Sequence, residues 1–162
     1  MLELRQRWGH PGSVTPREKP SWGILDPVAR KLRLPFATPK FIDRIIRGGA
    51  NQAGRRTLQM LFTTWDATGG GPFAASAIAT AGLAKTADVA QSLFIGPVFD
   101  PLLKTLGADQ ITFRASLCAS QVVGLGIMRY GVRVEPIASM DVNTLVDAVA
   151  PTLQRYLVGK IS

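Results

Sequence analysis

The sequence predicts an all-α fold, a single domain of about five or six helices. From residue 40 onward, apolar residues recur at the three- and four-residue spacing of amphipathic helices. Glycine runs and Gly–Pro pairs separate these periodic segments. The length of 162 residues, of which 46% are hydrophobic, is that of one domain with enough apolar side chains to fill one core.

The chain is expected to divide into residues 1–38 and residues 39–162. The first part is basic and rich in proline and has no sustained period, so it is expected to be largely irregular. Its tryptophans lie among arginines and lysines, and a nonspecific nucleic-acid arm stays open beside a poorly ordered tail. Residues 1–56 hold 12 Lys+Arg and 4 Asp+Glu, whereas the rest of the chain holds 7 of each, so the net charge of +8 is N-terminal.

Composition argues against several functional classes. The sequence has one cysteine, Cys118, and one histidine, His10, so one chain cannot assemble a disulfide framework or a Cys/His metal cluster. No paired carboxylates, Ser/His arrangement or P-loop occur, so neither catalysis nor a cofactor is expected. No apolar run follows Arg5 and Arg7, which argues against a signal peptide and for a cytoplasmic location. The uncharged stretch 115–128 is shorter than the roughly 20 residues that span a bilayer.

In the first half of the folded part, helices are predicted over about residues 41–46 and 52–66. Gly48 and Gly49 end the first, and a run of three glycines ends the second. The second places Leu58, Leu61, Phe62 and Trp65 on one face. A short helix is then predicted from Pro72 to residue 81, because proline suits a first helical position.

In the second half, residues 85–106 keep a helical stripe that Gly96–Pro97 interrupts, which predicts a kink or a break. Asp109 is predicted to cap a helix over residues 110–133. After a turn at 135–140, Asp141 is predicted to cap a final helix that ends near residue 159, and Pro151 within it is expected to bend it.

The last two predicted helices carry more apolar surface than one contact needs. The first has a ridge of small residues at four-residue spacing, and the second has a seam at three- and four-residue steps. These candidate dimer-interface residues are Ser116, Ser120 and Gly124, and Val146, Val149, Leu153 and Tyr156. They predict a four-helix bundle across a twofold axis, with burial within one chain as the equally weighted alternative.

Three stretches near the end of the chain carry a family resemblance, namely RASLCASQVVGLGIMRY (114–130), VEPIAS (134–139) and APTLQRYLVG (150–159). They are similar to the C-terminal end of tetracycline-repressor (TetR) family regulators. RGG (47–49), GRR (54–56) and LFTTWD (61–66) resemble the preceding helices. The resemblance covers about residues 32–160.

The resemblance implies a transcriptional regulator. In the family, an N-terminal helix-turn-helix domain binds operator DNA, and the C-terminal domain binds a small effector and forms a homodimer through its last two helices. Residues 1–31 show no helix-turn-helix pattern, since their prolines would break a recognition helix. DNA binding is therefore expected only through a missing or a partner's helix-turn-helix, and a late start or a disrupted reading frame is a hypothesis for this segment.

The family's effector pocket lies between the middle helices and the long helix that leads into the dimer bundle. The resemblance therefore implies a site for a small hydrophobic or aromatic effector, lined by Phe62, Trp65, Phe94, Val98, Cys118, Gln121 and Leu125. Ordinary core packing stays open for each apolar residue, and Cys118 is expected to be an inert core thiol. The alternative function is a dimerisation module that senses no ligand.

Overall fold

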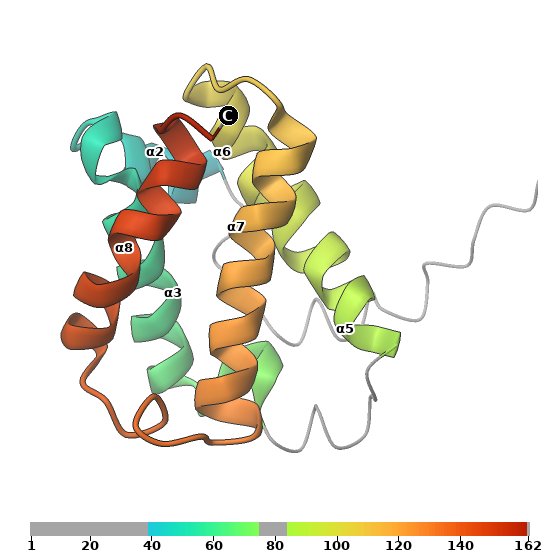
Figure 1. Cartoon of the computed structure of the whole chain (residues 1–162), viewed down its shortest axis with the longest axis vertical. Helices are drawn as coiled ribbons and strands as arrows, with labels where there is room; N and C mark the ends of the chain where they lie inside the picture. The colour runs from blue at the N-terminus through green and yellow to red at the C-terminus, as the bar shows by residue number, and fades with distance from the viewer. Residues whose placement is uncertain (1–38, 75–83, 162) are drawn as a thin grey trace, which may run out of the picture.

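A computed structural model describes residues 39–74 and 84–161. Every regular element within these two ranges is helical, so the predicted all-α fold is confirmed for the described residues (Figure 1). The character predicted for residues 1–38, and most of the helix predicted over residues 72–81, lie outside them.

The first two predicted helices are confirmed as α2 (Pro39–Ile46) and α3 (Ala53–Ala67), with the short 3₁₀ turn η2 (Ala50–Gln52) between them. After α3 the chain turns through glycines, of which Gly70 has a φ of 107° that favours a residue without a Cβ. A second 3₁₀ turn, η3 (Gly71–Phe73), follows. Ala74 leaves the helical conformation with a ψ of 138°, so the helix that the sequence predicts from Pro72 does not begin there.

The next segment is one continuous helical run of α5 (Ala84–Val89), η4 (Ala90–Phe99) and α6 (Asp100–Thr105). The sequence predicts a kink or a break at Gly96–Pro97, but the chain stays helical through both residues. η4, which contains Pro97, is π-helical rather than α-helical.

The long apolar helix follows as α7 (Ile111–Gly126), continued by the π-helical segment η5 (Ile127–Gly131). The prediction that Asp109 caps it is wrong, because Gln110 holds that position and Asp109 instead accepts two hydrogen bonds from the Arg114 guanidinium. The run of 21 residues is long and apolar enough to cross a membrane by length and composition alone. Its inner side packs into the core of the domain, as expected for a core helix.

The final helix, α8 (Val142–Val158), begins where the sequence predicts. The Asp141 carboxylate accepts from the backbone N–H groups of Asn143 and Thr144, at 2.9 and 3.1 Å, and so caps it. In Figure 1 α8 runs alongside α3 at the left of the molecule; it packs most extensively along α3 and also contacts α7.

α3 and α8 approach closely at Gly54. A Cβ on this residue would lie 2.6 Å from the backbone nitrogen of Gln154, so a side chain does not fit. The Gln154 side chain accepts from the Gly54 N–H at 2.8 Å and donates to the Ala50 carbonyl at 2.8 Å. A glycine and an amide therefore fix this crossing together.

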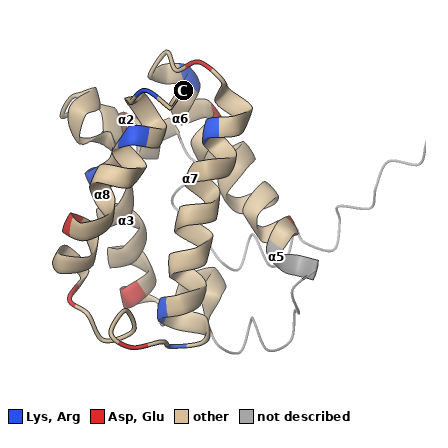
Figure 2. Ribbon diagram, in the orientation of Figure 1, with Lys and Arg blue, Asp and Glu red and all other residues tan. Residues whose placement is uncertain are grey.

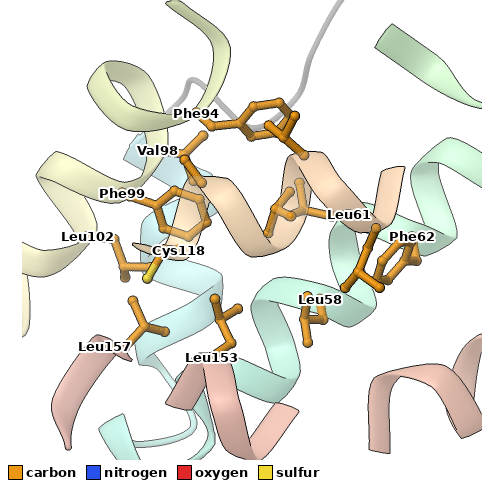
Figure 3. Close-up of a cluster of buried hydrophobic side chains, with 14 of the residues drawn as sticks. Leu58, Leu61, Phe62, Phe94, Val98, Phe99, Leu102, Cys118, Leu153 and Leu157 are labelled. Atoms are coloured by element: carbon orange, nitrogen blue, oxygen red, sulfur yellow. The ribbon is translucent and has the colours of Figure 1, made fainter. Parts of the chain in front are cut away.

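The core lies between these helices and is apolar. Figure 3 shows side chains from α3, η4, α6, α7 and α8 converging in one cluster. Members with no exposed surface include Leu58, Leu61, Phe62, Trp65, Phe94, Val98, Phe99, Leu102, Leu103, Leu153 and Leu157. Most of the binding energy between the helices therefore comes from burial of large apolar groups.

Gly54→Ala is expected to lower the free energy of unfolding by about 1–3 kcal/mol, because the added methyl group meets the backbone of α8. The matched control is Gly96→Ala, whose Cβ meets nothing closer than 3.6 Å. This control should raise stability by about 0.4–1 kcal/mol. Urea unfolding of both variants measures the difference, and equal effects would contradict the close approach.

Candidate functional site

Four aromatic side chains gather around Trp65, and we call these five residues the aromatic cluster. The ring of Trp65 lies edge-on to four others, with centroid distances of 5–6 Å that are favourable for aromatic pairs. The partners are Phe62 at 5.6 Å, Phe73 at 5.0 Å, Phe94 at 5.9 Å and Tyr130 at 6.1 Å.

Four elements build this cluster. Phe62 and Trp65 come from α3, and Phe73 comes from η3. Phe94 comes from η4 and Tyr130 from η5, so both π-helical segments of the described residues deliver a ring to the same place. π-helical turns are rare and occur frequently at functional sites, which marks the cluster as a candidate site.

The cluster has a polar rim on the side of Tyr130. The Tyr130 hydroxyl donates to the Asp66 carboxylate at 2.6 Å, and Arg129 donates to both oxygens of that carboxylate at 3.3 and 3.2 Å. Burial, and then the hydrogen bond to Asp66, raise the pKa of Tyr130, so its hydroxyl stays a donor at neutral pH. Burial alone would lower the pKa of Arg129, but Asp66 and Tyr130 more than compensate and raise it.

Two arginines of the long helix are buried. Arg129 donates to the carbonyls of Ile137 and Met140, at 2.8 and 2.7 Å, in the turn before α8. Arg114 donates to the Tyr156 carbonyl at 2.8 Å, at the C-terminal end of α8. These two residues bound the uncharged stretch 115–128, and the position of each charge beside a long apolar stretch is the signal in the sequence for its burial.

The predicted ligand-binding residues are only partly brought together. Phe62, Trp65 and Phe94 belong to the aromatic cluster, and Val98 lies beside Phe94 in Figure 3. The same view places Cys118 near Leu102, away from Phe62. Leu125 belongs to the general core.

Two further predicted residues have ordinary surroundings. Gln121 is half-buried, so water reaches its side chain and the amide does not require a ligand as its partner. Burial raises the pKa of the Cys118 thiol to about 12, despite the opposing effect of Arg114. The thiolate is therefore scarce at neutral pH, which favours a core role for this residue.

Sequence reasoning missed Phe73 and Tyr130 as members of the aromatic cluster, and Asp66 as its polar neighbour. Tyr130 lies within the stretch that carries the family resemblance, but it is near the end of its helix. Helical period alone could not show that a residue in this position turns toward α3.

The predicted dimer residues also divide between two environments. Ser116, Ser120 and Gly124 are exposed on the outer side of α7, and Val149 and Tyr156 are half-buried on α8. Val146 and Leu153 have no exposed surface. These two side chains fill the core of their own chain, so the surface that a partner could contact lies at other positions of α8.

We define the outer face by seven residues. Five are exposed, namely Phe113, Ser116, Ser120 and Gly124 on α7 and Met128 on η5, and two are half-buried on α8, namely Val149 and Tyr156. Figure 2 shows α7 and α8 side by side, and the middle turns of α7 carry no charged residue. Phe113 keeps 54% of its surface exposed, which is unusual for a phenylalanine.

Comparison with known families gives one match. The family described as tetracyclin repressor-like, C-terminal domain, matches residues 51–157. This range includes α3, η4, α7 and nearly all of α8, and therefore the whole aromatic cluster. No curated protein and no solved structure gives a significant match. Because the match covers more than half of the chain, the protein belongs to the TetR family of transcriptional regulators and carries their C-terminal domain over these residues.

Proposed function

We propose that this domain senses a small hydrophobic or aromatic effector and forms a homodimer, and that the aromatic cluster is the effector site. The observation that carries the proposal is the convergence of five rings and two π-helical segments beside the polar group of Asp66 and Tyr130. Ligand sites in proteins are mostly apolar and aromatic, with a few polar groups that fix orientation.

Effector binding requires a rearrangement, because Phe62, Trp65 and Phe94 are fully buried against one another. We expect an aromatic ligand to replace one of these ring contacts and to select a conformation in which η4 or η5 has moved. Both segments have π-helical geometry, which occurs frequently at functional sites, so we expect the movement in one of them.

The partner that we propose for the outer face is a second copy of this chain. Ser116, Ser120 and Gly124 allow another helix to approach closely, while Phe113 and Met128 supply apolar surface at either end. The homodimers formed by C-terminal domains of this family support the choice of occupant. An exposed apolar stripe without charges is typical of such interfaces.

The effector site is tested by thermal shift against a panel of neutral two- and three-ring aromatic compounds. A compound present at a hundredfold excess over its Kd should stabilise the native chain by about 2.7 kcal/mol, which is a rise in Tm of roughly 4 °C or more. Phe94→Leu should lose this shift. Phe99→Leu, which changes a buried ring of the same element outside the aromatic cluster, should keep it.

The absence of any stabilising compound would favour the alternative function, a dimerisation module that senses no ligand. This alternative is supported by the full burial of Phe62, Trp65 and Phe94, because a core that its own side chains already fill needs no ligand. A shift that is lost equally in Phe94→Leu and Phe99→Leu would place the effector elsewhere.

The dimer is tested with Ser120→Arg, a change at an exposed position that leaves the core intact. Sedimentation equilibrium should show a dimer for the native chain and a monomer for the variant, because two arginines would meet in an apolar contact. Thr63→Arg, at an exposed position of α3, is the matched control and should remain dimeric. If Ser120→Arg sediments like the native chain, the outer face is not the interface.

A further inference from the structure

We infer that Tyr130, Asp66 and Arg129 form a mechanical link, which couples the packing of the aromatic cluster to the N-terminal end of α8. Tyr130 connects the aromatic cluster to Asp66. Its ring lies 6.1 Å from that of Trp65 and 6.5 Å from that of Phe62, and its hydroxyl donates to Asp66 at 2.6 Å. A displacement of this ring therefore changes the hydrogen bonding of Asp66.

The second step runs from Asp66 to Arg129. The guanidinium donates to both carboxylate oxygens, at 3.3 and 3.2 Å, and only 8% of Arg129 is exposed. Because so little water reaches this cation, it depends on protein acceptors, and loss or rotation of the Asp66 carboxylate must be answered by movement of Arg129.

The third step runs from Arg129 to the turn before α8. A single nitrogen of its guanidinium, Nη1, donates to the carbonyls of Ile137 and Met140. Met140 is followed directly by Asp141, whose carboxylate caps α8 through the N–H groups of Asn143 and Thr144. The position of the turn therefore depends on the orientation of one guanidinium group.

The opposite end of α7 provides an internal comparison. There Arg114 is also buried and donates to the Asp109 carboxylate. It also donates to the Tyr156 carbonyl oxygen, at the C-terminal end of α8, at 2.8 Å. The hydrogen bonds given for Arg114 go to Asp109, Arg155 and Tyr156, none of which belongs to the aromatic cluster. The two ends share the same arginine–aspartate chemistry, but only Asp66–Arg129 connects to the rings.

The link has a regulatory meaning if the proposed function is correct. α8 contributes Val149 and Tyr156 to the outer face, so a ring displaced by an effector would shift one half of the proposed dimer surface. This meaning rests on the proposed function. The mechanical coupling itself concerns only contacts within one chain and can be tested without an effector.

Residue-resolved hydrogen exchange of the full chain tests the coupling. Phe94→Leu disturbs the aromatic cluster from η4, on a different element from the turn, and should speed exchange of the Met140, Asn143 and Thr144 amides by roughly tenfold. Phe99→Leu is the matched control and should leave these amides within about twofold of the native rate. Each rate is normalised to the Gly159 amide, which bonds to the Arg155 carbonyl at the far end of α8.

The link is then removed in two ways. Tyr130→Phe keeps the ring but loses the hydroxyl, and Asp66→Ala loses the carboxylate; in both backgrounds the additional effect of Phe94→Leu should fall below about twofold. Asp109→Ala is the control background and should retain the tenfold effect. Equal responses to Phe94→Leu and Phe99→Leu, or an effect that survives both Tyr130→Phe and Asp66→Ala, would overturn the inference.

Sedimentation of the same variants separates this inference from the proposed function. If the native chain is monomeric, the proposed dimer fails, yet the exchange experiment still decides the coupling. If the chain is dimeric, Phe94→Leu should change the dimer Kd by several-fold in the native background and not in Asp66→Ala. An unchanged Kd in both backgrounds would contradict transmission to the outer face.

Discussion

The arrangement of the last two helices depends on two buried cations. Arg114 and Arg129 sit near the two ends of the α7–η5 run, and each donates both to an aspartate and to backbone carbonyls at one end of α8. A buried guanidinium without acceptors is strongly unfavourable. Each arginine therefore requires its particular acceptors, whereas an apolar side chain can pack against many different neighbours. Burial of Leu145, Val146 and Leu153 holds α8 against the core, while the arginines fix its position along α7.

This constraint gives α7 two separate roles. Its inner side, continued by η5, reaches the core and brings Tyr130 to the aromatic cluster, whereas its outer side exposes Ser116, Ser120 and Gly124. A TetR-family C-terminal domain that senses a ligand and pairs with a second copy needs both surfaces on one rigid frame. The same helix is therefore positioned to connect the proposed effector site with the proposed partner surface.

Helical period and capping chemistry predicted much of this fold from the sequence. α3, the Asp141 cap and the end of α8 follow from local signals, and Phe62, Trp65 and Phe94 do lie together. Other features depend on tertiary contacts that no local pattern encodes. An apolar stripe does not say whether it faces the core or a partner. The seam pattern of α8 fits both, and Val146 and Leu153, which it offers as dimer residues, are fully buried in their own chain. Likewise, aspartate is a residue type that often caps helices, but the Asp109 carboxylate accepts from the buried guanidinium of Arg114 instead of from the helix N–H groups.

The most direct test of the central claim is a double-mutant cycle on the free energy of unfolding, with Asp66→Ala and Arg129→Gln made singly and together. If Arg129 holds the turn before α8 through Asp66, the two changes should be non-additive, with an interaction energy of about 1–3 kcal/mol. Additive effects within about 0.5 kcal/mol would mean that the two side chains act independently. That result would contradict the view that this buried pair fixes the position of α8.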